Sequence, residues 1–501
     1  MIEIVDVLLP IFTLAIAALL TIPVFRLIRN SNYQTALTLG WFIAVFAITG
    51  AWVANLALNY YSVPSPSIVA LGLSPTSSSI FSSAFLIDAI SIYMAIIIVA
   101  LSAVVMIYTV FSVDSNARPS ERYFAIMLMT TAGVLGAVLA GDLLTLFIFW
   151  EVATAGAAFL MLFKKNAFSI NATLKYLIMV IIASAFVMLG MSIVYGLTGT
   201  LNYLGVGREL STLSSNHLLI VAFVFIAAGY AIEAAIVPFH FWLPDAYTAA
   251  PAPSTAFLSA LVDQGSYYIL IRVLLYVLLP STLNWTVMLA VMAALTMIVG
   301  NLFALIQNDV KRLLAYICVA DIGYNLVAIS SVTALGLLGN LYFFLIGGIT
   351  TALAFMTIGI MNTHGFKSLD DFSGLGKKMP LACLALVIAG LSFAGVPPFG
   401  GFIAKYLVFT AAIEANLSWL AVIGVLTSVL QAAYLFRLIF VMYGKKSRDE
   451  IAVKESKRIL VPVLILAGSL LILGLFPSIV LNLIHPVVHQ LQTIIPNLPT
   501  V

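Results

Sequence analysis

Long apolar stretches separated by short polar connections repeat along the whole chain. A helix needs about 20 apolar residues to cross the hydrocarbon core of a bilayer, and many stretches of the sequence reach that length. The longest connections, around residues 59–83, 198–216 and 363–378, leave no room for a soluble domain. The pattern predicts an all-α integral membrane protein with a single membrane domain over residues 1–501. Fourteen transmembrane helices are expected, beginning near Val5, Ala36, Ala84, Arg122, Asp142, Ala172, His217, Ser254, Asn284, Lys311, Gly336, Leu381, Leu417 and Ile459.

Two of the expected helices are interrupted at bilayer depth. Helix seven carries Glu233 and then Pro238, and helix twelve carries a run of glycine and proline over residues 395–400 before Lys405. A proline at this depth frees backbone groups that neighbours must satisfy, and paired breaks in two halves of a transporter indicate structural repeats with ion sites near the midplane. We therefore expect two inverted five-helix repeats with broken helices seven and twelve. The expected divisions are helices one to three (1–111), helices four to eight (122–278), helices nine to thirteen (284–443) and helix fourteen (457–485).

The positive charges are distributed unevenly among the connections. If the first helix runs inward, 17 of the 22 lysines and arginines fall in connections that face the cytoplasm. This asymmetry places both termini outside a multi-pass protein of the cell membrane. It also explains the net charge of +3 without a nucleic acid partner. The seventeen are Arg26, Arg29, Arg118, Arg122, Lys164, Lys165, Lys311, Arg312, Lys367, Lys377, Lys378, Lys445, Lys446, Arg448, Lys454, Lys457 and Arg458.

The chain offers no evident redox, nucleotide or metal site. Its two cysteines, Cys318 and Cys383, are isolated and cannot hold an iron–sulfur cluster. The sequence has no Walker motif and no dinucleotide glycine fingerprint, and its five histidines are scattered. We expect no cofactor on this chain, so an ion gradient or a partner subunit must supply the energy.

Ionisable residues inside the apolar stretches are the candidates for function. An ionised side chain at bilayer depth costs several kcal/mol unless it meets a partner, water or the protein interior. Glu233 and Lys405 both meet this description beside a helix break. Asp142 can equally cap helix five, and His240 is as consistent with a histidine satisfied by the backbone as with a proton carrier.

Other charged residues have simpler explanations. Asp88, at the start of helix three, is expected to order the outer surface. Lys311 and Arg312 begin helix ten at the cytoplasmic face, where charges are inexpensive. Arg272 is long enough to extend to the membrane interface.

Four strings resemble a known family. They are GDLLTLFIFWE (141–151), VPFHFWLPDAYTAAPAPSTAFLSAL (237–261), NDVKRLLAYICVADIGY (308–324) and GVPPFGGFIAKYLVF (395–409). In this order they resemble the antiporter-like subunits, which are the proton-channel subunits of respiratory complex I, the Mrp cation/proton antiporters and the energy-converting membrane-bound hydrogenases. The resemblance covers at least helices three to thirteen.

The resemblance implies a row of titratable residues through which protons pass with internal water. The helix-five glutamate of the family matches Glu151, and the helix-twelve lysine matches Lys405. Lys175 matches the basic residue commonly found on helix six.

Other positions depart from the family pattern. Glu233 stands where relatives have the helix-seven lysine, and Gln264, with Asp263 beside it, stands at the helix-eight lysine position. On helix eleven, Gly347 and Thr351 occupy the places of titratable residues, and Asp321 occupies a polar site on helix ten that is usually His, Gln or Ser. The row has therefore lost central bases and gained acids.

Replacing a lysine by Glu233 puts two carboxyls in one cavity. Like charges in a poorly solvated site do not both ionise readily. We hypothesise that Glu151 and Glu233 share a proton or form part of a hydrated cation site, with Lys175 as the nearby balancing charge. The alternative is that the row no longer conducts and the subunit is a scaffold.

The resulting prediction is an antiporter-like subunit that translocates H⁺, Na⁺ or both within a respiratory redox complex. The expected type is a membrane-bound hydrogenase or sulfur reductase, in which this chain is a diverged copy. The predicted translocation residues are Glu151, Lys175, Glu233, His240, Asp263 and Lys405, followed by Asp142 and Asp321. Expected partners are a second antiporter-like subunit, other membrane subunits, lipid, and peripheral subunits carrying iron–sulfur clusters and a NiFe-type centre. The alternatives are a subunit of a non-redox Mrp-type Na⁺/H⁺ antiporter and a non-conducting scaffold.

Overall fold

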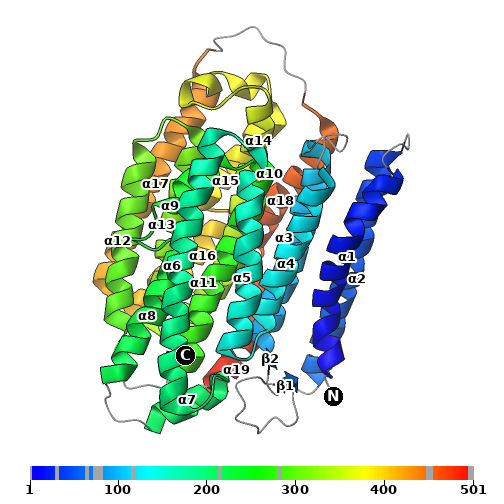
Figure 1. The fold of residues 1–501 in the computed structure, drawn as a ribbon. Coiled ribbons are helices and arrows are strands. Elements are labelled where there is room, and N and C mark those ends of the chain that lie inside the picture. The colour runs from blue at the N-terminus through cyan, green and yellow to red at the C-terminus, as the bar shows by residue number, and fades with distance from the viewer. Residues whose placement is uncertain are drawn as a thin grey trace.

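Long helices that share one axis direction make up almost all of the chain (Figure 1). The computed structural model describes residues 3–28, 33–62, 67–71, 83–113, 120–212, 217–278, 285–446 and 455–494. The helix start expected at Asn284 and the basic residues Arg29, Arg118, Arg448 and Lys454 lie outside the described residues.

The chain order of the elements is as follows. The first part comprises α1 (Ile4–Ile28), α2 (Gln34–Ser62), β1 (Ser67–Leu71), β2 (Ser83–Ile87), α3 (Ala89–Ser112), α4 (Ser120–Leu139), α5 (Leu143–Met161), η1 (Leu162–Lys164), α6 (Ala167–Thr198), α7 (Tyr203–Thr212), α8 (His217–Glu233), α9 (Trp242–Ala249), α10 (Ala252–Phe257), the π-helical η2 (Leu258–Val262), α11 (Asp263–Val273) and the π-helical η3 (Leu274–Leu278). The second part comprises α12 (Thr286–Leu305), α13 (Val310–Ser331), α14 (Ala334–Thr363), η4 (Leu369–Phe372), η5 (Leu375–Lys377), α15 (Pro380–Ala394), α16 (Gly400–Glu414), α17 (Ser418–Gly444), α18 (Lys457–Leu475) and α19 (Ser478–Ile494). The strands β1 and β2 pair antiparallel.

Twelve helices in the described part of the chain are long and apolar enough to cross a membrane. The prediction of a helical, multi-pass membrane protein is confirmed. The two remaining expected spans are each divided into shorter helices, because a nonhelical segment separates α8 from α9 and another separates α15 from α16.

The two breaks share one backbone pattern. In the first break, Ala235 has a φ of 50°, and in the second, Gly395 has a φ of 71°; each break also contains a cis X–Pro peptide bond. The same three backbone hydrogen bonds recur 160 residues apart. They are Ala235 N to Ile232 O, Ile236 N to Ala231 O and Phe239 N to Ile236 O in the first break, and Gly395 N to Ser392 O, Val396 N to Leu391 O and Phe399 N to Val396 O in the second.

A second pattern recurs at the starts of α5 and α13. Asp142 accepts a hydrogen bond from the backbone N–H of Thr145, and Asp309 accepts one from that of Arg312, so each aspartate caps its helix. Each aspartate also forms an isolated antiparallel bridge, Asp142 with Asn202 and Asp309 with Ser368. The segment that follows α6 is thereby fastened to the start of α5, and the segment that follows α14 is fastened to the start of α13 in the same way.

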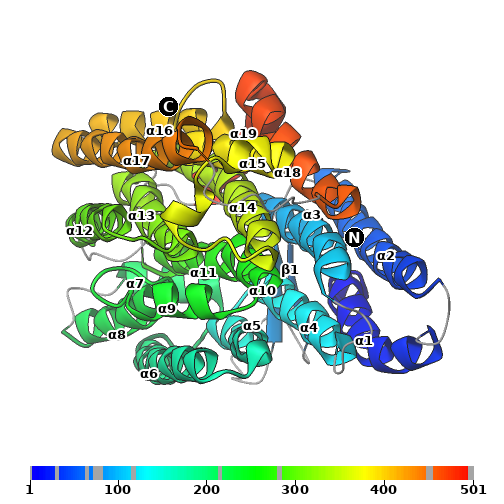
Figure 2. The same ribbon diagram turned by 90° about the horizontal axis from the view of Figure 1, so that it is seen from above.

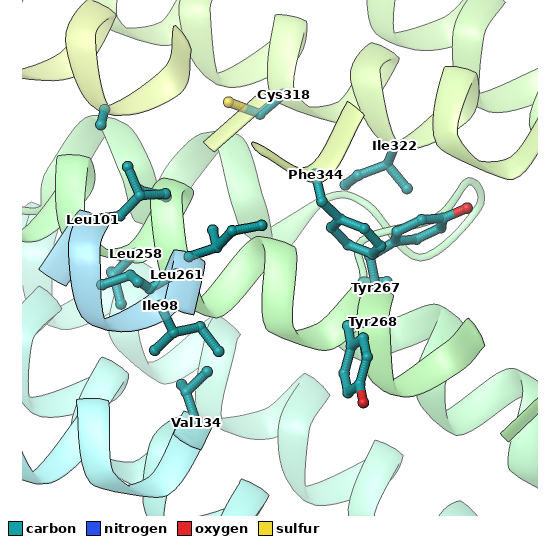
Figure 3. Close-up of a cluster of buried hydrophobic side chains, with 14 of the residues drawn as sticks. Ile98, Leu101, Val134, Leu258, Leu261, Tyr267, Tyr268, Cys318, Ile322 and Phe344 are labelled. Atoms are coloured by element: carbon teal, nitrogen blue, oxygen red, sulfur yellow. The ribbon is translucent and has the colours of Figure 1, made fainter. Parts of the chain in front are cut away.

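The centre of the bundle is formed by α10, α11, α13 and α14 (Figure 2). In the spans at 252–277, 310–331 and 334–363, 94% of the apolar window is buried, against 33% in α2 and α6. The apolar core includes side chains from α3, α4, η2, α11, α13 and α14 (Figure 3), where the rings of Tyr267 and Phe344 lie 5.4 Å apart. Polar residues on these central helices are therefore shielded from lipid.

Candidate functional site

Two glutamates interact with each other in the first half of the molecule. Glu233 is the last residue of α8 and is buried, and it interacts electrostatically with Glu151 of α5. Glu151 is half-buried and accepts a hydrogen bond of 2.5 Å from the hydroxyl of Ser184 on α6. Tyr176 and Tyr230 also lie within electrostatic range of both carboxyls. The structure therefore brings together the two acids that the sequence placed in one cavity.

Lys175 lies elsewhere than expected. Its ammonium is 2.6 Å from Asp245 of α9, and 62% of its side chain is exposed. Nine residues separate Lys175 from Ser184, the α6 residue that reaches Glu151, and nine residues are about two and a half turns of an α-helix. The two side chains thus leave opposite sides of α6, so Lys175 pairs with Asp245 rather than balancing the two glutamates. Arg312 also pairs with Asp245, at 2.9 Å.

The middle of the row is at Asp263. This residue begins α11 directly after the π-helical segment η2, a local irregularity that is frequent at functional sites. Its carboxyl is buried, and the Tyr247 hydroxyl of α9 lies within hydrogen-bonding range. Asp263 also interacts electrostatically with Asp321 of α13. It therefore links the first half of the molecule to the second.

The α14 positions where the resemblance expects titratable side chains are occupied by Gly347 and Thr351, and neither side chain is titratable. A β-carbon built on Gly347 would lie 3.5 Å from the Gln264 amide nitrogen, so the two positions are neighbours. The Thr351 hydroxyl donates to the carbonyls of Gly347 and Gly348 within its own helix. An amide and a hydroxyl thus occupy the places that the resemblance assigns to bases.

Lys405 occupies the far end of the row. Its side chain is buried, and its ammonium donates to Gln431 Oε1 at 2.6 Å and to Ser428 Oγ at 3.2 Å, both on α17. The ammonium also lies 4.0 Å from the centre of the Tyr324 ring on α13. Asp321 interacts electrostatically with Lys405, yet within the described residues the pair is not close enough to form a salt bridge. The far end therefore combines an acid and a base, unlike the near end.

The other candidate residues lie outside the row. Asp142 uses its carboxylate for three hydrogen bonds, from Thr145 N, Thr145 Oγ1 and Ala84 N, so it caps α5 and fastens β2. His240 is buried in the first break beside the rings of Phe241 and Phe303. Its Nδ1 has no hydrogen-bond partner among the residues that the structure describes.

Two buried cations differ from the sequence expectations. Arg272 does not extend to the interface: it is 1% exposed and its Nη1 lies 2.6 Å from Asp88, which also accepts from the Tyr276 hydroxyl. Lys311 is buried and donates to the carbonyl of Ala250 at the end of α9. The sequence gives little indication that Lys311 is buried. For Arg272 it gives more, because Arg272 and Tyr276 stand one helical turn apart in an apolar stretch, a spacing typical of a shared polar partner.

Sequence reasoning also missed Gln431 and Ser428. They lie three residues apart on one face of a mostly apolar helix, and that spacing is a detectable signal. Nothing in the sequence pairs them with Lys405, because that contact depends on how α16 packs against α17.

Several buried polar atoms along the row lack a protein partner within the described ranges. Buried polar groups normally have a hydrogen-bond partner, either protein or ordered water, so these atoms are suited to binding internal water. In the same ranges, no group of three or more His, Cys, Asp and Glu side chains could hold a metal ion. The unpartnered atoms are Gln264 Oε1, Asp321 Oδ1, Asn325 Oδ1, Asn340 Oδ1 and Gln431 Nε2.

Comparison with known proteins agrees with this arrangement. Residues 140–431 match the family described as NADH:quinone oxidoreductase/Mrp antiporter, transmembrane. The chain is 32% identical over 444 residues to F(420)H(2) dehydrogenase subunit N of Methanosarcina mazei, and the alignment covers 85% of this chain and 89% of that protein. It is 31% identical over 396 residues to NADH-quinone oxidoreductase subunit N of Desulforamulus reducens, covering 79% of this chain and 83% of that protein.

Among solved structures, the chain is similar to one in the membrane-bound sulfane sulfur reductase, an archaeal respiratory membrane complex. The TM-score is 0.88 at 27% identity, with 98% of this chain and 99% of that chain covered. The matched family region contains Glu151, Glu233, Asp263, Asp321 and Lys405. This chain therefore belongs to the NADH:quinone oxidoreductase/Mrp antiporter transmembrane family and is an antiporter-like membrane subunit.

Proposed function

We propose that this chain translocates H⁺ or Na⁺ as one module of a redox-driven membrane complex of the hydrogenase or sulfur reductase type. The observation that carries the proposal is a row of ionisable side chains inside the bundle, from the half-buried Glu151 through the buried Glu233, Asp263 and Asp321 to the buried Lys405. Such residues are expensive inside a membrane and mark ion pathways.

The row suits an ion relay for two physical reasons. Glu151 interacts electrostatically with Glu233, Asp263 with Asp321, and Asp321 with Lys405, so a change in the charge of one member of each pair alters the energy of charging the other. Tyr176 lies within electrostatic range of Glu151, Glu233 and Asp263 and so stands between the first pair and Asp263. The unpartnered amide and carboxyl oxygens between them provide sites where water bridges the gaps. At the near end, Glu151 and Glu233 hold one shared proton or cation rather than two negative charges.

The proposal includes fourteen spans arranged as three leading helices, two inverted repeats and a final helix. Helices seven and twelve are α8 with α9 and α15 with α16. The matched hydrogen bonds at the two breaks, and the matched caps at Asp142 and Asp309, support two five-helix repeats.

The proposed orientation places the ends of α5, α14 and α17 in the cytoplasm. Lys164 lies within electrostatic range of Lys367, Asp309 and Lys311, so basic residues from several connections gather at one end of the bundle. The β1–β2 hairpin and the start of α1 lie at the opposite end (Figure 1). The positive-inside rule then puts both termini outside the cell membrane.

The chain itself supplies no electron carrier in this proposal. Iron–sulfur clusters and a NiFe-type centre belong to peripheral partners, and a second antiporter-like subunit works beside this diverged copy. The support is the high similarity to a chain of a respiratory sulfane sulfur reductase and to subunits of two redox complexes.

The test is ion-coupled turnover of the assembled complex in proteoliposomes. We expect the double replacement Glu233→Ala with Asp263→Ala to lower it by about tenfold or more, because both carboxyls are links in one series path. The matched control is Glu209→Ala, an exposed acid on α7 outside the row. Unchanged turnover of a correctly assembled double variant would show that the subunit is a scaffold.

The second candidate is an Mrp-type Na⁺/H⁺ antiporter, because the matched family includes the Mrp antiporters. Mass spectrometry of the complex purified in mild detergent separates the two. Hydrogenase-like or iron–sulfur subunits support the redox assignment, whereas small membrane subunits alone support the antiporter.

A further inference from the structure

The groups that directly contact the Lys405 ammonium in the described part of the chain are uncharged. Gln431 Oε1 and Ser428 Oγ accept two of its hydrogen bonds, and the centre of the Tyr324 ring lies 4.0 Å away. An ammonium has three donors and no acceptor, and a ring face at this distance attracts a cation. These three neighbours therefore form a complete cradle for a charged lysine.

The Gln431 side chain also lies within interaction range of Asp321. It is completely buried, its Oε1 is used by Lys405, and its Nε2 has no hydrogen-bond partner in the described part of the chain. The Gln431 amide oxygen accepts the hydrogen bond from Lys405, and the amide nitrogen keeps an unused donor. Gln431 therefore holds Lys405 in place without occupying the Asp321 carboxyl.

Asp321, by contrast, has free binding capacity. Its Oδ1 makes no hydrogen bond to the described protein residues. The carboxyl and Lys405 line a cavity of about 10 Å³. That volume corresponds to about one water. Gly347 lines the same cavity, so the space lies beside the α14 position where relatives have a base.

We propose that Asp321 is the proton carrier at this end of the row, and that Lys405 is a fixed cation held in its cradle as the counter-charge. The resemblance assigns proton transfer to the helix-twelve lysine, so this inference reverses the roles of the two residues. It rests on the proposed function of the row.

The proton balance is simple. A proton reaching the cavity water forms an O–H bond with Oδ1 of Asp321, and the same bond breaks when the proton moves on. Lys405 keeps its three N–H bonds throughout. The cavity wall is otherwise mainly apolar, and its two hydroxyls, Thr350 and Ser392, are 3.0 Å apart and hydrogen-bonded to each other. This small space, with few oxygen atoms in its wall, suits a proton better than a metal cation with its several oxygen ligands.

Three variants of the assembled complex separate the two roles. Asp321→Asn removes the carrier and should lower ion-coupled turnover by about tenfold or more. Lys405→Arg keeps a cation that does not lose its proton, so turnover should stay within about threefold of the unmodified complex. The combined Asp321→Asn and Lys405→Met variant removes both charges and should be as inactive as Asp321→Asn alone.

The control is Asp309→Asn, the same chemical change on the same helix, at a helix cap where asparagine serves as well. It should leave turnover unchanged. If Lys405→Arg were as inactive as Asp321→Asn in an assembled complex, the lysine would be the carrier. Recovery in the double variant would mean that the two charges only balance each other. Either result overturns the proposal.

Infrared difference spectroscopy during turnover gives a second measurement if arginine does not fit the cradle. A carboxyl C=O band that appears in the unmodified complex and is absent in Asp321→Asn supports the proposal, and identical spectra overturn it. The double variant with Glu233→Ala and Asp263→Ala distinguishes a failure of the Asp321 inference from a failure of the proposed function. If it loses coupling while Asp321→Asn does not, only the Asp321 inference fails; if neither loses coupling, the proposed function fails.

Discussion

The two helix breaks have the same backbone but different chemistry. Both use the same three hydrogen bonds and a residue in the left-handed region, Ala235 in the first and Gly395 in the second. The first break follows Glu233, which faces another acid, whereas the second precedes Lys405, which faces Asp321 across a small cavity. The backbone pattern is therefore independent of the sign of the charge that the break displays.

The helix dipoles explain why Glu233 and Lys405 each need stabilising neighbours. Glu233 is at the C-terminus of α8, and Lys405 is in the second turn of α16. A helix stabilises cations at its C-terminus and anions at its N-terminus, so the dipole stabilises neither side chain in its charged form. Lys405 has the uncharged neighbours of its cradle, whereas for Glu233 we propose a proton or cation shared with Glu151.

The largest stability difference between the breaks should come from Gly401 and Phe241, which are 160 residues apart in matched positions. A β-carbon on Gly401 would overlap the Ser392 carbonyl oxygen, while Phe241 is 67% exposed. We expect Gly401→Ala to destabilise the subunit by about 3 kcal/mol through overpacking. Phe241→Ala should change stability by less than about 0.5 kcal/mol. Thermal unfolding of the purified complex measures both. Equal melting temperatures of the two variants would contradict the expected difference in packing between Gly401 and Phe241.

The next difference concerns the two caps. Asp142 is buried and accepts three hydrogen bonds, two of them from Thr145 and one from Ala84, whereas Asp309 accepts one side-chain hydrogen bond, from the Arg312 N–H. Asp142→Ala should cost about 2 kcal/mol, because it removes a cap and leaves buried donors unpaired. Asp309→Ala should cost about 1 kcal/mol. A larger loss for Asp309 in thermal unfolding would contradict this order.

The smallest expected effect is at Asp245, the matched position of Lys405 after the first break. Asp245 pairs with Lys175 and Arg312, but the lysine side chain is mostly exposed. Exposed ion pairs contribute about 0–1 kcal/mol, so Asp245→Asn should leave both melting temperature and ion-coupled turnover almost unchanged. A loss of turnover in this variant would indicate that Lys175 takes part in ion translocation.

The fold was accessible from the sequence because apolar stretches and prolines are local signals. The two acids at Glu151 and Glu233 were also found, since the resemblance gave one position and the break gave the other. Lys175 was misplaced because a family match ignores helical register: nine residues on α6 turn it away from Ser184 and Glu151. The cradle of Lys405 was missed because it depends on tertiary packing between α16 and α17. Arg272 was misjudged because the sequence could not show that Asp88 reaches it.

In the proposed function one row carries ions through both halves of the molecule, and Asp263 of the first half interacts with Asp321 of the second. The most direct measurement is ion uptake per electron transferred by proteoliposomes containing the complex with Asp263→Asn. We predict a fall of about tenfold in ion uptake per electron with normal assembly, because the Asp263 carboxyl is the member of the row that interacts with Asp321 of the second half. An assembled variant with unchanged ion uptake per electron would contradict it.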